Sequence, residues 1–182
     1  MIPAIAALAL ASASTQPNAT SSQPLASGAP WWERVTVSVT DDGTTQGCKY
    51  ESSLGGGKAK DCSVSTDQAA ATKASSSAGA KDKITRITFE RRFTPQAKPV
   101  DPTLAPGDLL LGAAVMALAI DGKGAVEHCQ IVSTSGSVTP QYGCDEVSAE
   151  RFDASAADPH LRAAAREGYM TILVYGHSEH VV

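Results

Sequence analysis

Four cysteines in two matched pairs constrain this chain more than any other feature. Cys48 and Cys62 lie fourteen residues apart, and Cys129 and Cys144 lie fifteen residues apart. An even cysteine count without a Cys-x-x-Cys motif is typical of two disulfides in an exported protein, whereas in the cytosol it would mean four thiols. Of the three possible connectivities, the matched spacing favours Cys48–Cys62 and Cys129–Cys144.

The cysteine pairs belong to a longer internal repeat. Residues 48–55 align with residues 129–136 without a gap, and residues 84–89 align with residues 170–175. An Asp-Gly pair also precedes the first cysteine of each half. This shared order predicts two tandem copies of one unit, built from a hairpin, a cysteine turn, a helix and a final strand. The alternative is chance similarity between two β-rich halves.

The second copy has the clearer pattern. The apolar run 109–120 predicts a buried strand, and Asp121-Gly122 predicts a hairpin turn because glycine tolerates the positive φ that such turns need. A second strand is expected at 126–132. Apolar residues at helical spacing over 144–152 predict a short amphipathic helix, and a last strand is expected at 169–175.

The first copy follows the same order with a weaker helix. Alternating valine and polar residues predict a strand at 34–40, and further strands are expected at 48–53 and 83–93. Residues 66–80 are expected to form a helix that is short of large apolar side chains. The charged group at the end of the last strand, Glu90-Arg91-Arg92, is interpreted as solvated.

With these features, the second copy resembles a known family, the C-terminal domain of TonB, the periplasmic energy transducer of Gram-negative bacteria. The resemblance rests on Asp121-Gly122, a strand, the Ser-x-Ser-Gly turn at 133–136, and a helix followed by Arg151-Phe152. It covers roughly residues 107–182. The better match is a branch of the family with two added cysteines, at the places where Cys129 and Cys144 stand here.

The resemblance implies an α+β fold of two layers, in which a small antiparallel sheet carries a helix packed on one face, and the repeat predicts that this unit occurs twice. In the family, the sheet edge near the end of the domain accepts an extended peptide of an outer-membrane transporter by strand addition. Carried to this chain, the resemblance implies docking at 169–175. The side chains expected beside the added peptide are Thr171, Leu173 and Tyr175. Those expected to face the helix are Met170, Ile172 and Val174.

Composition divides the chain into segments. Residues 1–13 are small and apolar and end in Ala-x-Ala, which is typical of a cleaved signal peptide, although a disordered start is the alternative. Trp31-Trp32 is interpreted as an anchor on the domain edge rather than a binding patch. The expected segments are a signal peptide (1–13), a disordered spacer (14–30), a degenerate TonB C-terminal-like unit (31–93), a Pro-rich linker (94–106) and a TonB C-terminal-like domain (107–182).

Candidate chemistry is sparse in this sequence. His177-x-x-His180 with Glu179 and His160 is the only metal-like group, and residues three apart on a strand point to opposite faces, so no metal site is expected. No nucleophile motif or phosphate-binding loop is present, and no cofactor is expected. The alternative to a binding protein is a small periplasmic hydrolase that uses His160 or His177.

The sequence therefore predicts a periplasmic or secreted, non-enzymatic protein of the cell envelope. Its expected partner is a protein or extended peptide, such as an outer-membrane transporter. The net charge of −4 and the absence of a basic run argue against nucleic acid as a partner. The longest apolar runs are too short to span a membrane, so no transmembrane segment is expected.

Overall fold

The computed structural model describes residues 24–40, 44–63, 84–99, 103–153 and 166–178. The predicted signal peptide, the helix predicted at 66–80 and the candidate residue His160 lie outside these residues. The described elements, in chain order, are β1 (Trp31–Val39), β2 (Thr45–Ser52), the 3-10 turn η1 (Ser53–Gly55), β3 (Lys60–Asp61), β4 (Ile84–Pro95), β5 (Asp108–Ile120), β6 (Val126–Gly136), the helix α2 (Cys144–Ala149) and β7 (Arg166–Ser178).

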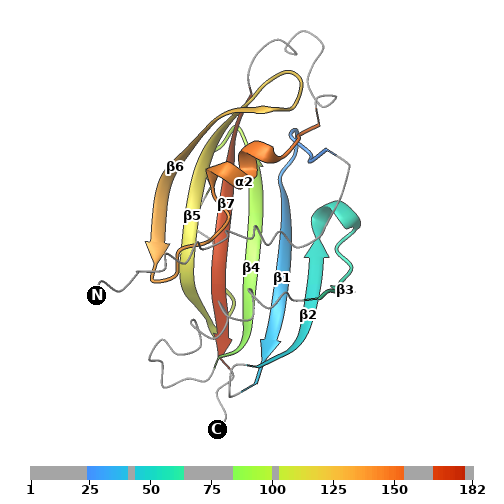
Figure 1. Cartoon of the computed structure of the whole chain (residues 1–182), viewed down its shortest axis with the longest axis vertical. Helices are drawn as coiled ribbons and strands as arrows, with labels where there is room; N and C mark the ends of the chain where they lie inside the picture. Colours follow the sequence, from blue (N-terminus) through green and yellow to red (C-terminus); the bar gives the residue numbers. More distant parts are fainter. Residues whose placement is uncertain (1–23, 41–43, 64–83, 100–102, 154–165, 179–182) are drawn as a thin grey trace, which may run out of the picture.

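All seven strands form one antiparallel sheet in the order β3-β2-β1-β4-β7-β5-β6, and α2 lies across one face of it (Figure 1). The expectation of an α+β fold, with two separate small sheets that each carry a helix, is therefore wrong. The reason is that the last strands of the two halves, β4 and β7, pair with each other along nearly their whole length. The described residues form a mostly β architecture with a single short helix.

The repeat is nevertheless visible in the strand order. Within the first half, β1 pairs with β2 on one side and with β4 on the other. Within the second half, β5 pairs in the same way with β6 and with β7. The strand order is thus mirrored about the β4–β7 pair (Figure 1). The β1–β2 hairpin lies outside β4, and the β5–β6 hairpin lies outside β7.

Both predicted disulfides are present, Cys48–Cys62 and Cys129–Cys144. Each joins a strand of a hairpin, β2 or β6, to the segment that follows that hairpin. Two disulfides are compatible with an extracytoplasmic protein. No helix among the described residues has the length and apolar character needed to cross a membrane.

The turn between β5 and β6 forms at the predicted Asp-Gly pair. The Asp121 carboxylate accepts hydrogen bonds from the backbone N–H groups of Lys123 (2.8 Å) and Ala125 (2.7 Å), as aspartate does in tight turns. Gly124 has φ +83°, and a Cβ there would meet the carbonyl oxygen of Phe152. Glycine is needed at 124 for both reasons.

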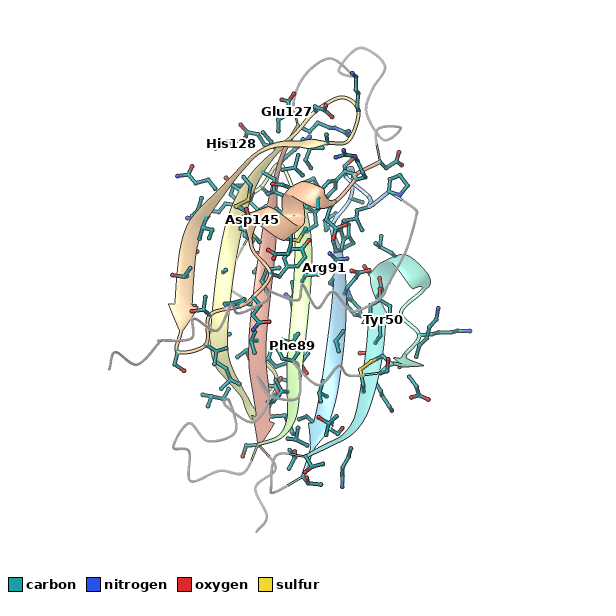
Figure 2. The ribbon with its side chains drawn as sticks, viewed as in Figure 1. Tyr50, Phe89, Arg91, Glu127, His128 and Asp145 are labelled. Carbon is teal, nitrogen blue, oxygen red and sulfur yellow. A yellow bond between two sulfur atoms is a disulfide. The ribbon has the colours of Figure 1, made fainter. Side chains whose placement is uncertain are left out.

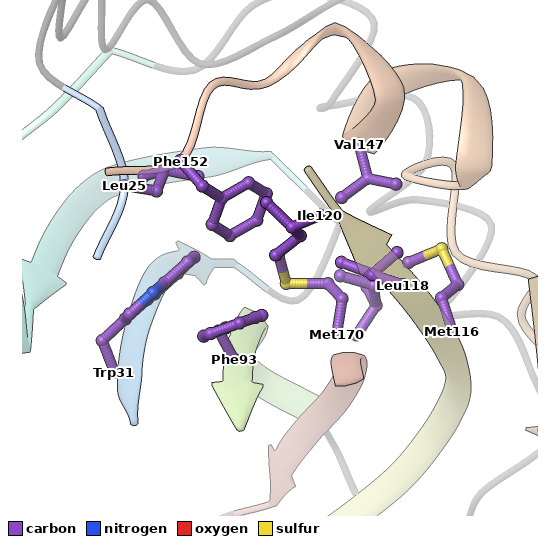
Figure 3. Close-up of a cluster of buried hydrophobic side chains, with 10 residues drawn as sticks. Leu25, Trp31, Phe93, Met116, Leu118, Ile120, Val147, Phe152 and Met170 are labelled. Carbon is purple, nitrogen blue, oxygen red and sulfur yellow. The ribbon is translucent and has the colours of Figure 1, made fainter. Parts of the chain in front are cut away.

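The main hydrophobic core lies between the sheet and the α2 segment, and it mixes side chains from both halves of the chain (Figure 3). Trp31 stacks on Phe93, with 5.9 Å between ring centroids, and Phe93 contacts Phe152 at 5.1 Å. The buried members are Leu25, Trp31, Phe93, Met116, Leu118, Ile120, Val147, Phe152, Met170 and Ile172. Because Trp31 and Phe93 come from the first half, the second half does not complete its own core.

Candidate docking edge

The strand predicted to dock a partner lies inside the sheet, which corrects that prediction. β7 is paired with β4 on one side and with β5 on the other. Of the three residues expected beside an added peptide, Thr171 and Leu173 are buried and Tyr175 is half-buried. Neither side of this strand is open to another chain. The first half of the molecule occupies the position that the resemblance assigned to a partner.

The opposite face of β7 behaves as expected. Met170 and Ile172 are buried in the main core, which also contains Val147 of α2. Val174 is buried in a smaller cluster with Ile87 and Leu111. The alternation of the last strand was therefore assigned to the correct faces, although the strand is not an edge.

Among the described residues, the long open edge of the sheet is β6. This strand pairs only with β5, and its side chains are mostly exposed. Ile131 is 51% exposed and Val132 is 43% exposed, which is unusual for large apolar side chains on adjacent residues of a strand. An unpaired strand offers a row of free backbone N–H and C=O groups, so it can accept an extended polypeptide.

Two β-bulges interrupt this edge. The pairing with β5 skips Glu127 and Val132, so each of these residues is an extra residue on β6. Bulges bend an edge strand and limit indiscriminate pairing, and they also re-aim side chains near functional sites. The regular parts of the edge are consequently short, 128–131 and 133–136, which fits a short partner segment rather than a long sheet-to-sheet seam.

The other edge of the sheet is partly covered. The two-residue strand β3 covers part of β2, and the Cys48–Cys62 disulfide holds the chain against it. The backbone N–H of Cys62 donates to the carbonyl oxygen of Cys48 at 3.1 Å. β3 consists of Lys60 and Asp61, both exposed, and short charged strands are a common way of protecting an edge. The mirrored strand order therefore ends in one edge that is partly covered and one that is open along its whole length.

The helix α2 stands directly beside the open edge. The Cys129–Cys144 disulfide ties its first residue to β6, and Val147 anchors it in the core. The Glu146 carboxylate accepts the backbone N–H of Gly143 at 2.8 Å, which satisfies one of the free groups at the helix start. A six-residue helix is unstable alone, so these contacts hold it in place.

The C-terminal end of α2 is held by Arg91 of β4. The Arg91 guanidinium donates from Nε to Oε2 of Glu33 on β1 at 2.6 Å. It also donates from Nη1 to Oε1 of Glu150, the residue that follows α2, at 2.8 Å. The Tyr142 hydroxyl also lies 3.2 Å from Arg91 Nη1 and 3.1 Å from the Glu150 carboxylate. On the other side of the cluster, the Tyr50 hydroxyl donates to Glu33 at 2.6 Å. Figure 2 shows Arg91 and Tyr50 on the face that carries α2.

The electrostatics of this Arg91 cluster follow from its burial. Burial opposes the charge of Arg91, but the Glu33 and Glu150 carboxylates and the Tyr142 hydroxyl outweigh that effect, so the pKa of Arg91 is raised above its ordinary value. Burial, together with Glu150, raises the pKa of Tyr142, and burial and Glu33 raise the pKa of Tyr50. Arg91 therefore stays charged and both phenols stay neutral, as a structural clamp between the two halves requires.

A second charged cluster lies on the opposite face of the sheet. Glu90 is buried and contacts the guanidinium of Arg92, and it accepts the Tyr175 hydroxyl at 2.9 Å. Burial and the neighbouring Glu90 raise the pKa of Tyr175 to about 12. Arg34 lies 3.8 Å from Glu90 and stacks over the Trp32 ring. This cluster also binds strands to one another.

The histidine proposed for the hydrolase alternative has a structural partner. His177 Nδ1 lies 2.7 Å from Oδ1 of Asp108, at the start of β5. The ends of β5 and β7 are also joined here by the backbone N–H of Ser178, which donates to the carbonyl oxygen of Gly107 at 3.0 Å. His160, the other histidine of that alternative, lies outside the described residues. In the part of the chain that the structure describes, no group of three or more His, Cys, Asp or Glu residues is placed to hold a metal ion.

Charge is unevenly distributed around the open edge. Residues 124–150, which include β6 and α2, have four acidic residues and neither lysine nor arginine, but the exposed Lys123 and Arg151 flank this segment at the hairpin end. Two of the acidic residues are engaged, since Glu146 caps the helix and Glu150 binds Arg91. The other two, Glu127 and Asp145, are exposed and have no ion pair among the described residues (Figure 2). The docking edge therefore carries exposed charges of both signs, with Lys123 and Arg151 at the end where Glu127 lies.

Sequence reasoning missed both the open edge and the Arg91 cluster. The prediction that Glu90-Arg91-Arg92 is solvated is wrong, since Glu90 is buried and Arg91 is mostly buried. A signal for the cluster was present: β1 and β4 both contain the dipeptide Glu-Arg. In the antiparallel register Glu33 faces Arg91 and Arg34 faces Glu90, so opposite charges meet across the strands.

Comparisons with known proteins give no further guide. The chain matches no protein-family model, no curated protein and no solved structure.

Proposed function

We propose that this protein is an exported, non-enzymatic binding protein of the cell envelope that captures an extended polypeptide by strand addition at β6. The observation that carries the proposal is the asymmetry of the sheet edges. At one edge, a charged two-residue strand and a disulfide cover part of β2, whereas the open strand at the other edge has eleven residues, two of them large, apolar and exposed. An edge left open in this way is a binding surface for a partner strand.

The contacts that hold β6 in place are consistent with this role. An edge strand that receives a partner must hold its own register while one side is empty. The hairpin turn at Asp121 and the disulfide from Cys129 to the core-anchored helix both fix β6 relative to the sheet. The partner's main chain would supply affinity, and its alternating side chains would lie beside Ile131 on the helix face. The resemblance to the TonB C-terminal domain favours the same mode of binding, at a different strand.

The periplasm or the extracellular space is the proposed location. Both disulfides require an oxidising compartment for their formation, and the N-terminal residues 1–13 have the composition of an export signal. An outer-membrane protein with an extended terminal segment is the proposed kind of partner. Energy transduction is not included in this proposal.

The test combines capture with amide exchange. Wild-type protein and Ile131→Lys are immobilised and exposed to an envelope extract, and we expect the substitution to abolish capture of the specific partner because an edge lysine blocks strand pairing. Hydrogen exchange with the recovered partner should then show new protection in β6 and none in β2 or β3.

Leu109→Lys is the matched control, because Leu109 is 52% exposed and also lies on a strand. It should capture the partner as the wild type does. The proposal fails if Ile131→Lys retains the partner, or if the partner protects amides elsewhere and leaves β6 unchanged.

A further inference from the structure

Residues 25–27, called the strap below, lie against residues 151–153, which follow α2 in the chain. The backbone N–H of Leu25 donates to the carbonyl oxygen of Arg151 at 2.8 Å, and the carbonyl oxygen of Leu25 accepts the backbone N–H of Asp153 at 2.6 Å. These two bonds pair Leu25 with Phe152 as a parallel bridge. The strap is thus held by main-chain hydrogen bonds in the way that an extended peptide binds to a strand edge.

The groove that holds the strap begins with an apolar position. Leu25 is 7% exposed and packs in the main core, where it lies beside Phe152 (Figure 3). The next residue, Ala26, is partly buried against the same core, and its carbonyl oxygen accepts the Trp31 indole N–H at 2.7 Å. The floor of the groove is fixed to the sheet, because the backbone N–H of Phe152 donates to the carbonyl oxygen of Gly124 at 2.8 Å.

The groove ends with a position that selects a hydroxyl group. The Ser27 side chain is buried, and its hydroxyl donates to the carbonyl oxygen of Asp153 at 2.7 Å. The same hydroxyl accepts a hydrogen bond from Nη1 of Arg166 at 2.6 Å, while Nη2 of Arg166 donates to the Asp153 carbonyl oxygen at 3.2 Å. Only a group that both donates and accepts can satisfy these two partners, which favours serine or threonine at this position.

A short exposed connection joins the strap to the sheet. Gly28, Ala29 and Pro30 are all exposed, and β1 keeps its pairing with β4 from Trp31 onward. Leu25 is the only large apolar side chain that the strap buries. Segments with few buried apolar contacts open most readily, so the strap can leave the groove while the sheet remains paired.

We propose that this groove is a second polypeptide-binding site, which the strap occupies at rest and which accepts an extended segment of the same chemistry from a partner. The chemistry is a leucine followed, two residues later, by serine or threonine. Because the strap competes for the groove, the partner's apparent affinity is reduced by the fraction of molecules in which the groove is open. The site uses residues 151–153 and not β6, so this inference goes beyond the proposed function and does not rest on it.

The test uses a labelled peptide with the sequence of residues 21–29 and measures its affinity for the full chain by fluorescence anisotropy. Leu25→Asp places a charge where the groove is apolar and should release the strap, so this variant should bind the peptide about tenfold more tightly than the wild type does. Ser27→Ala keeps the core leucine and should give a smaller gain. Ser27→Ala also serves as the open-groove variant if Leu25→Asp lacks a cooperative thermal transition.

Changes in the peptide check the two selective positions. The peptide with Leu25→Asp should not bind, the peptide with Ser27→Ala should bind more weakly, and the peptide with Ser27→Thr should keep its affinity. Adding Arg166→Met to the Leu25→Asp protein should remove the preference for serine over alanine in the peptide, because Arg166 donates to that hydroxyl.

Ile131→Lys separates this site from the β6 edge. It blocks strand addition at β6 and should leave peptide binding to the Leu25→Asp protein unchanged. Loss of binding in that combination would place the peptide on β6 and overturn the inference, as would equal affinities of the wild type and both open-groove variants. A wild-type dimer in sedimentation velocity that Leu25→Asp dissociates would show that two copies exchange their straps, and the foreign partner would be wrong.

Discussion

At the scale of single residues, Arg91 links the two halves of the chain by ion pairs. It binds Glu33 of the first half and Glu150 of the second, and all three side chains are less than a quarter exposed. Replacing a buried member of such a cluster leaves carboxylates without a counter-charge, so Arg91→Ala should lower the free energy of unfolding by about 3 kcal/mol in urea denaturation.

Arg151→Ala is the control for this prediction, because Arg151 is exposed and should cost no more than ~0.5 kcal/mol. Adding Glu33→Gln to an Arg91→Met variant should recover part of the loss, since it removes one of the two carboxylates left without a counter-charge. Equal effects of Arg91→Ala and Arg151→Ala would contradict the structural role of the cluster.

Tyr175 gives the molecule a predictable response to alkaline pH. Burial and Glu90 raise its pKa from 10.0 to about 12, so the folded state favours the neutral phenol. This contribution is complete below pH 10. Above it, the unfolded chain releases the proton first, and stability declines as the pH rises from 10 to 12. All four cysteines are in disulfides, so no free thiolate of the protein promotes exchange in this range.

We therefore expect Tyr175→Phe to lose less stability than the wild type between pH 10 and pH 12. Urea denaturation at several pH values in this range measures the difference in slope. Parallel slopes for the two proteins would show that the Tyr175 phenol does not ionise differently in the folded and unfolded states.

At the scale of elements, the Cys129–Cys144 disulfide links the helix to the docking edge. It closes a loop with a sequence separation of 15, and the chain-entropy model gives about 3 kcal/mol for such a loop. The double replacement Cys129→Ala with Cys144→Ala should lower the free energy of unfolding by about this amount. It should also speed amide exchange in α2, because six residues do not hold a helix alone.

Replacing Cys48 and Cys62 by alanine is the matched comparison, since that loop has a sequence separation of 14. The loss of stability should be similar, while exchange in α2 should stay unchanged. If both double replacements speed exchange in α2 equally, the helix is held by global stability and not by its own disulfide.

The elements themselves could be predicted from the sequence more accurately than their assembly. Alternation and turn chemistry located β5, β6 and β7 to within a few residues, because period-2 patterns and Asp-Gly turns act locally. The β4–β7 pairing could not be found in this way, since both sides of a strand offer the same hydrogen-bonding groups. The docking edge was misplaced for that reason: edge or interior position depends on which distant strand arrives beside it.

At the scale of the whole molecule, the two halves share one sheet and one main hydrophobic core. The sequence predicts that the segment 94–106 is a linker and that 107–182 folds alone, yet the structure gives the second half a core completed by Trp31 and Phe93. A fragment 103–182 would expose β7 as a new edge and uncover Phe152. We expect it to self-associate or to lack a cooperative thermal transition, as measured by sedimentation velocity and circular dichroism.

Adding a fragment of residues 24–99 to this second-half fragment should restore a cooperative transition, because it returns β4 to the side of β7. A second half that melts cooperatively as a monomer would show that the seam joins two independent domains. In that case the predicted linker would act as one.

The β4–β7 pair also determines when the sheet can be completed during synthesis or export. Residues 96–165 separate the two strands, so β4 leaves the ribosome or the export channel well before β7 does. Until residues 166–178 arrive, β4 is an open edge beside the unburied Trp31 and Phe93, which is the condition in which nascent β proteins associate wrongly. Because non-local strand pairing slows folding, we expect the closing of this distant contact to be the slow step.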